Sequence, residues 1–286
     1  MNIVYLNGAY LPREEARVSV DDRGFVFGDG VYEFTPLYRG RSLRLESRLE
    51  RLRRGLRSLR IDYDAGAVPG IYAGLIDRNR LAEREAAALY IQVTRGTGPR
   101  THAFQRPAAA PTVYAFPAPL PSPDPAAWEA GLTAVTVPDT RWGRVDLKTL
   151  QLLPNVLAQE AAVRAGADEA ILVRDGLALE GGRSNLFTVL DGVARTHPAS
   201  NQILPGITRA MILELAAERG CEIREMPTPV DALADASEVF MTGSSTEIKS
   251  VVRIDGRRVG DGAPGPVARE LYGALREAVA SGRLEG

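Results

Sequence analysis

The sequence has little of several residue types, and each scarcity excludes a class of protein. One cysteine, Cys221, among 286 residues excludes an intramolecular disulfide framework and is typical of a reducing compartment. No apolar run reaches the ~18 residues of a membrane-spanning helix, and residues 1–13 lack a secretory signal pattern. A formal net charge of −1 leaves no basic excess for nucleic acid. We therefore expect a cytoplasmic globular protein that binds neither nucleic acid nor a membrane.

Lysine is the most informative scarcity. Of the 35 basic residues only Lys148 and Lys249 are lysines, and all others are arginines. Either residue keeps an exposed surface soluble, but an arginine cannot lose its proton in a protein whereas a lysine can. A reaction that needs a neutral amine, such as imine formation, therefore has to keep its lysine. We interpret Lys148 as such a residue, and Lys249 as a lysine without a special role.

The length predicts about two domains. Seven prolines between Pro107 and Pro125 disfavour helix and predict a stiff, extended connector. We expect an N-terminal domain over residues 1–118, a linker over 119–131 and a C-terminal domain over 132–286. Because short strands alternate with helices, the predicted fold class is α/β or α+β.

The hydrophobic pattern predicts the individual elements. The clearest helix covers residues 43–60, where leucines are spaced four, three and four apart. Strands are predicted over 2–6, 9–11, 31–38, 87–94, 112–116, 132–137, 169–174, 177–180, 186–190, 193–196 and 237–242, and further helices over 67–81, 149–165, 206–219 and 267–280.

Two segments carry residues with catalytic potential. Lys148 follows a strand and directly precedes the helix predicted from residue 149. If it is enclosed, desolvation and nearby arginines lower its pKa and make it a nucleophile; the alternative is a surface lysine beside Asp146. Glu180 ends a strand and precedes a flexible polar loop. It can hold a protonated ring nitrogen or cap the next element, and both interpretations remain open.

Two further segments can bind an anion. Leu204–Thr208 begins a helix, whose free N–H groups and dipole attract phosphate; the alternative is a plain turn with Thr208 as N-cap. Thr242–Thr246 is a hydroxyl-rich turn after a strand and is a weak signal by itself. A lysine nucleophile, an acid for a ring nitrogen and two phosphate-binding turns are together what a pyridoxal phosphate enzyme requires of its protein.

These residues resemble the fold-type IV pyridoxal phosphate enzymes, which include D-amino-acid aminotransferases, branched-chain aminotransferases and aminodeoxychorismate lyases. The resemblance spans nearly the whole chain, from Phe27–Glu33 to Met241–Gly243, and is most specific over Arg141–Asn155. It implies a smaller N-terminal and a larger C-terminal domain with pyridoxal 5'-phosphate between them. It also implies that Lys148 forms the internal aldimine and shuttles a proton between Cα and C4′, and that Glu180 keeps the pyridine nitrogen protonated.

The resemblance also assigns the other cofactor-binding positions. Arg51 matches the family's phosphate-binding arginine, and a guanidinium fork suits phosphate oxygens. Arg183 departs from the family, because many relatives have a small residue there. The remaining cofactor-binding residues that the resemblance implies are Ser184 and Asn185 after the glutamate, Leu204 against the ring, and Ile207, Thr208 and Ser244 in the phosphate cup.

The substrate site follows from the same resemblance. Arg100 and His102 resemble the Arg-x-His carboxylate trap of bacterial D-amino-acid aminotransferases, where both come from the partner subunit and act with a tyrosine that matches Tyr32. Ser245 is assigned to the same substrate site. This implies a homodimer with its active site at the subunit interface. Without the resemblance, His102 is an ordinary loop histidine, and His197 has only a structural role.

The expected function is pyridoxal-phosphate-dependent transamination of D-amino acids such as D-alanine and D-glutamate. The acceptor is a 2-oxo acid such as 2-oxoglutarate or pyruvate, in ping-pong half-reactions. A branched-chain aminotransferase usually has Gly and Arg after the glutamate that matches Glu33, whereas Phe34 and Thr35 follow here. An aminodeoxychorismate lyase shares the lysine but gains no support from the trap. A scaffold without cofactor is disfavoured because Lys148 persists in a lysine-poor chain, and no metal is expected.

Overall fold

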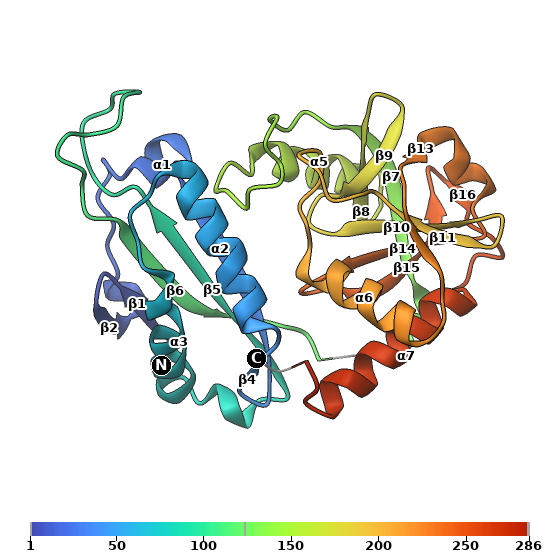
Figure 1. Ribbon diagram of the computed structural model, residues 1–286, viewed down its shortest axis with the longest axis horizontal. Coiled ribbons are helices and arrows are strands. Elements are labelled where there is room, and N and C mark those ends of the chain that lie inside the picture. Colours follow the sequence, from blue (N-terminus) through green and yellow to red (C-terminus); the bar gives the residue numbers. More distant parts are fainter. Residues whose placement is uncertain (1, 123, 285–286) are drawn as a thin grey trace. The chain divides into compact units, whose positions relative to one another are not determined.

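The structure, a computed structural model, describes residues 2–122 and 124–284. Its contacts divide the chain into two compact units, each with its own sheet (Figure 1). The first unit extends to Ser122 and also includes Leu147–Gln151 and Leu284, whereas the second takes the rest. The mixed α/β class is confirmed. The boundaries expected at residues 118 and 132 stay predictions, although Leu147–Gln151 departs from them because it belongs with the first unit.

The first unit is a six-stranded antiparallel sheet with helices packed on it. The predicted hairpin turns at Asn7 and Gly8, which both have positive φ. Leu49, Leu52 and Leu56 of α2 are buried in the core against the sheet, as their spacing predicts. The sheet order is β2–β1–β6–β5–β3–β4, and the elements are β1 (Ile3–Leu6), β2 (Ala9–Pro12), η1 (Arg13–Glu15), α1 (Arg23–Phe27), β3 (Gly30–Tyr38), β4 (Arg41–Ser42), α2 (Leu45–Leu59), η2 (Ala65–Ala67), α3 (Val68–Arg78), η3 (Leu81–Glu83), β5 (Ala86–Thr94) and β6 (Thr112–Ala118).

The second unit is a larger mixed sheet covered by helices. The sheet order is β12–β11–β10–β14–β15–β7–β8–β9–β13, with β16 beside β15. A pairing of Glu180 on β9 with Asn185 on β10 closes β10, β14, β15, β7, β8 and β9 into a ring. The elements are α4 (Pro125–Ala130), β7 (Leu132–Pro138), α5 (Leu153–Arg164), β8 (Glu169–Arg174), β9 (Leu177–Gly181), β10 (Asn185–Leu190), β11 (Val193–Thr196), α6 (Ile207–Glu218), β12 (Ile223–Glu225), β13 (Thr228–Pro229), η4 (Val230–Asp235), β14 (Glu238–Gly243), β15 (Glu247–Ile254), β16 (Arg257–Arg258) and α7 (Pro266–Ala280).

Two expectations about helices were wrong. The helix predicted from residue 149 begins only at Leu153, because the segment before it pairs with β3: Thr149 forms a bridge with Val31, and the Lys148 carbonyl accepts from the Tyr32 N–H at 3.0 Å. The linker expected over residues 119–131 contains α4, which starts at the last proline of the stretch expected to be extended: Asp124 caps the helix, and Pro125 is the first helical residue, where proline is favoured.

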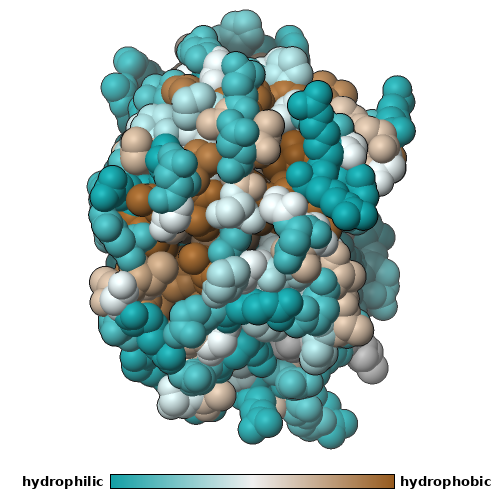
Figure 2. All heavy atoms as spheres, turned by 90° about the vertical axis from the view of Figure 1, so that its right-hand side faces the viewer, coloured by the Kyte–Doolittle hydropathy of each residue, from teal (hydrophilic) through white to brown (hydrophobic). Residues whose placement is uncertain are grey.

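On the face shown in Figure 2, hydrophilic side chains form most of the outer layer and apolar residues lie between them. No helix of the described residues has both the length and the apolar character needed to span a bilayer.

Candidate active site

Lys148 lies on the extended segment that pairs with β3 in the first unit. Its Nζ is 4.2 Å from the centre of the Tyr32 ring, which stacks on Tyr90 at 5.4 Å. Asp146, the alternative partner, instead binds Arg144 through two hydrogen bonds of 2.9 and 3.0 Å. Among the described residues no carboxylate forms an ion pair with Lys148. A half-buried amine held on an aromatic face without a counter-ion is suited to covalent chemistry.

Arg51 in the same unit is held by a carboxylate that sequence reasoning missed. Its Nε and Nη2 donate to the two oxygens of Glu33 at 2.8 and 3.0 Å, and Glu33 is only 2 % exposed. Arg48 is also buried there, and its burial lowers the pKa of Arg48 to about 10 although Glu33 opposes the shift. Glu33 therefore fixes the plane of the Arg51 guanidinium, whose phosphate-binding role stays a prediction.

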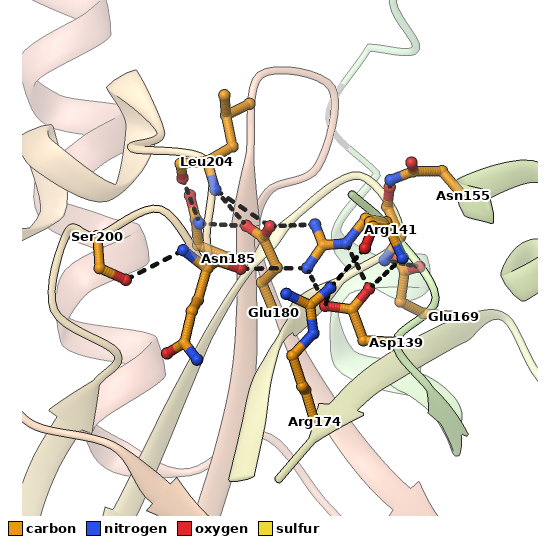
Figure 3. Close-up of polar contacts among 11 residues, drawn as sticks. Asp139, Arg141, Asn155, Glu169, Arg174, Glu180, Asn185, Ser200 and Leu204 are labelled. Carbon is orange, nitrogen blue, oxygen red and sulfur yellow. Dashed lines mark hydrogen bonds and ion pairs between the residues drawn. The ribbon is translucent and has the colours of Figure 1, made fainter. Parts of the chain in front are cut away.

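Glu180 is the centre of the polar network in the second unit (Figure 3). Its carboxylate accepts from Arg141 Nη1, from Asn185 Nδ2 at 2.8 Å and from the Leu204 N–H at 3.1 and 3.2 Å. Burial raises the pKa of Glu180 to about 7, against the opposing charge of Arg141. A buried carboxyl poised near neutrality ionises more completely when a cation is placed beside it. The structure thus brings together Glu180, Asn185 and Leu204, three of the residues expected to bind one cofactor.

Asp139 forms a second ion pair with Arg141, in addition to that of Glu180 (Figure 3). Arg141 Nε and Nη2 donate to Asp139 at 2.8 and 3.0 Å, and Arg174 Nη2 lies 2.9 Å from Asp139 Oδ2. Although burial acts in the opposite direction, hydrogen bonds from Arg141 hold the pKa of Asp139 below its usual range. Sequence reasoning missed Asp139 and Arg174, because neither lies in a motif and their pairing depends on tertiary structure.

The loop after Glu180 is fixed by a second buried carboxylate, Glu169. Its oxygens accept from the Ser184 hydroxyl at 3.1 Å and from the Gly182 N–H at 3.2 Å. Burial raises the pKa of Glu169, while backbone hydrogen bonds and the positive charge of Arg183 oppose the shift. Ser184 therefore directs its hydroxyl to Glu169, and its expected contact with the cofactor stays a prediction.

The start of α6 can accept an anion. Its N-cap is Gly206 rather than Thr208, and no side chain caps the first N–H groups, which include those of Ile207 and Thr208. A Cβ added to Gly206 would stand 2.0 Å from the amide oxygen of Asn185, so a larger residue there would displace the Asn185 side chain. The start of α6 therefore packs against Asn185, which also binds Glu180.

The turn after β14 contributes hydroxyl groups nearby. Thr242 lies directly opposite Asn185 across β10 and β14, so the two side chains share a face of the sheet. The Thr242 hydroxyl is buried and has no hydrogen-bond partner among the described residues. Ser244 is half-buried and Ser245 is exposed in the following turn. A buried hydroxyl without a partner is costly unless a bound group completes it, so the site fits a polar ligand.

Arg100 and His102 lie in an exposed loop after β5 in the first unit. Both contact Phe27: the Arg100 guanidinium is 5.6 Å from the ring centre, and the His102 ring centre is 5.8 Å away. The structure thus brings these two expected substrate residues onto one aromatic ring, and it brings Tyr32 to Lys148. The meeting of the two groups over a common substrate stays a prediction.

A family model described as amino-transferase class IV matches residues 30–254. The chain belongs to the class IV aminotransferase family. D-alanine aminotransferases of Staphylococcus haemolyticus and Bacillus licheniformis are each 38% identical, the first over 98% of this chain and 99% of its own, the second over 97% of both. The branched-chain amino acid aminotransferase of Escherichia coli is similar in structure, with a TM-score of 0.87 and 26% identity. The match covers 100% of this chain and 95% of that chain. A hypothetical aminotransferase from Mycobacterium tuberculosis in its PLP-bound form has a TM-score of 0.85 and 26% identity, and the match covers 98% of this chain and 100% of that chain. The fold-type IV resemblance is confirmed.

Proposed function

We propose that the protein transfers amino groups from D-amino acids to 2-oxo acids and uses pyridoxal 5'-phosphate. The observation that carries the proposal is the position of Lys148, one of only two lysines. Its amine lies on the Tyr32 ring, and no carboxylate among the described residues forms an ion pair with it. The two D-alanine aminotransferases, alike over nearly the whole chain, support the choice of donor. The cytoplasm is the proposed compartment, and the single free Cys221 supports it.

The residues of the second unit fit this cofactor. Glu180 would keep the ring nitrogen protonated, because it is a buried carboxylate supported by Arg141. The α6 start with Ile207 and Thr208 would hold the phosphate together with Ser244, and Leu204 would pack against the ring. Arg51 of the first unit is the further phosphate ligand that we propose. When bound, pyridoxal 5'-phosphate supplies an aldehyde that condenses with amines and a ring that withdraws electrons from the substrate Cα.

The protein's own groups then bind and move the substrate. With the cofactor bound, Lys148 Nζ would act as the base that removes the proton from the substrate Cα, while the Tyr32 ring limits where Nζ can lie. Arg100 and His102 hold the α-carboxylate together with the Tyr32 hydroxyl. A carboxylate fixed on one side determines which enantiomer presents its Cα–H to Lys148, and this selects the D-isomer.

The trap residues act across a homodimer. Arg100 and His102 are exposed in the single chain, which suits residues that serve the active site of a second copy. Large apolar side chains of the same unit are exposed as well, which favours burial against another subunit. These side chains are Val18, Val20, Phe25 and Phe104.

The test measures turnover of D-alanine and of L-leucine with 2-oxoglutarate as acceptor, by the glutamate formed in each case. We expect turnover with D-alanine at least about 100-fold faster than with L-leucine, a difference of ~2.7 kcal/mol in activation free energy. The likeness to the Escherichia coli enzyme makes branched-chain transamination the second candidate. Faster turnover of L-leucine would select that candidate and contradict the proposed donor.

A further inference from the structure

Asp29 is the centre of an ion-pair network that the chemistry above does not use. It lies between α1 and β3 and accepts from Arg23 Nε at 2.8 Å and from Arg95 Nε and Nη2 at 2.8 and 2.9 Å. Although burial acts in the opposite direction, hydrogen bonds from Arg95 and Arg23 hold the pKa of Asp29 below its usual range. We call Asp29, Arg23 and Arg95 the Asp29 clamp.

The Asp29 clamp is anchored to the core of the first unit. Arg95 also donates to the carbonyls of Leu59 and Arg60 at 2.7 and 3.0 Å, and so binds the C-terminal end of α2. The backbone N–H of Arg23 donates to the Gly96 carbonyl at 2.9 Å. Both arginines are more than nine-tenths buried. Their guanidinium groups are therefore fixed in position by packed elements.

The free sides of these guanidinium groups hold the loop that carries the trap. Arg23 Nη1 donates to the Thr101 carbonyl at 2.7 Å, and Thr101 lies between Arg100 and His102. The Arg95 guanidinium stacks on the Phe104 ring at 3.7 Å. Figure 1 shows α1 beside this loop. The clamp thus contacts the chain on both sides of His102.

The same arginine also fixes the ring on which the trap side chains lie. The Arg23 guanidinium is 4.7 Å from the centre of the Phe27 ring. Phe27 contacts both Arg100 and His102, as described above. Arg23 therefore determines the position of the trap backbone at Thr101 and of the surface beneath its side chains.

We infer that the Asp29 clamp positions Arg100 and His102 for binding of the substrate carboxylate. The inference rests on the proposed function, because it assigns supports to the trap proposed there. The trap loop is exposed and has little packing of its own, so without fixed supports its residues would lose orientation. Asp29, Arg23 and Arg95 are positioning residues, and the groups that touch substrate remain Arg100 and His102.

The test compares two clamp variants with Arg100→Ala in the D-alanine assay. Asp29→Asn removes the charge that orients both arginines. Arg23→Lys keeps a positive charge beside Asp29, but a single ammonium cannot reproduce the fork that joins Asp29 to Thr101. The matched control is Arg57→Gln, which removes an exposed ion pair with Glu50 on α2. KM, kcat, the Ki of propionate and the Kd of pyridoxal 5'-phosphate are measured for each protein.

We expect both clamp variants to raise KM for D-alanine and Ki for propionate about tenfold in parallel, or ~1.4 kcal/mol. The expected change in kcat is below about threefold, with Kd for the cofactor unchanged, because a loosened trap affects carboxylate binding alone. Arg57→Gln should match the wild type.

Three results would overturn the inference. If Arg100→Ala raises KM but both clamp variants match the wild type, the trap stands and the clamp does not support it. If the clamp variants lower kcat and weaken cofactor binding as well as raising KM, the clamp only stabilises the fold. If Arg100→Ala itself leaves KM unchanged, the proposed carboxylate site is wrong and the inference falls with it.

Discussion

Replacing Glu180 with glutamine tests the central carboxylate through the stability of the cofactor-free protein. The pKa of Glu180 rises from its usual 4.5 to about 7 because the group is buried. Below pH 4.5 the carboxyl is protonated in both the folded and the unfolded chain, so its burial carries no ionisation cost. Above that pH the unfolded chain ionises first, and the folded protein is destabilised increasingly until the pH passes about 7.

The expected size follows from the difference in pKa. A shift from 4.5 to about 7 corresponds to about 3 kcal/mol at 1.36 kcal/mol for each pH unit. Wild type should therefore lose about 3 kcal/mol of unfolding free energy relative to Glu180→Gln between roughly pH 4.5 and pH 7. For a domain of this size, that corresponds to a gap in melting temperature of roughly 6–12 °C at neutral pH.

The assay is thermal unfolding of both cofactor-free proteins from pH 4.5 to pH 8, with Glu14→Gln at an exposed position as the control. Adding pyridoxal 5'-phosphate should close the gap, because a ring cation beside Glu180 favours its ionised form. Turnover of Glu180→Gln should fall at least about 100-fold. A difference in melting temperature between wild type and Glu180→Gln that stays constant across the whole pH range would refute this reasoning.

The other predictions concern the remaining parts of the site. Lys148→Ala should abolish turnover and leave no cofactor attached after borohydride reduction and denaturation. Mass spectrometry of the wild type and the variant measures the attached cofactor, and retained turnover would contradict the role of Lys148. Arg51→Ala should weaken cofactor binding and, because it leaves Glu33 buried without its partner, cost about 3–5 kcal/mol of stability; Glu33→Gln in the same chain should recover part of the melting temperature, and no recovery would count against the pair. His102→Ala should raise KM for D-alanine at least about fivefold with the cofactor spectrum unchanged, as an ~1 kcal/mol hydrogen bond requires; an equal loss of cofactor binding would indicate misfolding instead.

Most of the longer elements were predictable from local pattern, whereas the strands β4, β12, β13, β15 and β16 were not predicted. The leucine spacing of α2 and the turn at Asn7–Gly8 are signals contained in a few neighbouring residues. The helices α1 and α4 were missed because five or six residues show no helical period. The helix start near Thr149 was misplaced because pairing with β3, a contact distant in sequence, overrides local preference.

The same distinction applies to the candidate site. Lys148 was recognisable because lysine is rare in this chain, and Glu180 because it follows a strand and precedes a glycine-rich loop. Glu169 and Glu33, the partner of Arg51, were not recognisable, since each acts through a side chain that only the folded chain brings near. Asp139 was not recognisable either, because only the folded chain joins it to Arg174 as well as to its sequence neighbour Arg141. Charged residues are common on every surface, so only their burial and pairing mark them as part of a site.

The most direct test of the account is the absorption spectrum of the purified, cofactor-loaded protein. The protein is mixed separately with D-alanine, D-glutamate, L-leucine and L-glutamate, without a 2-oxo acid. We expect the D-amino acids alone to convert the yellow form to the pyridoxamine form. Conversion by L-leucine or L-glutamate in place of the D-amino acids would contradict the assigned stereochemistry, and conversion by none of the four would contradict transamination itself.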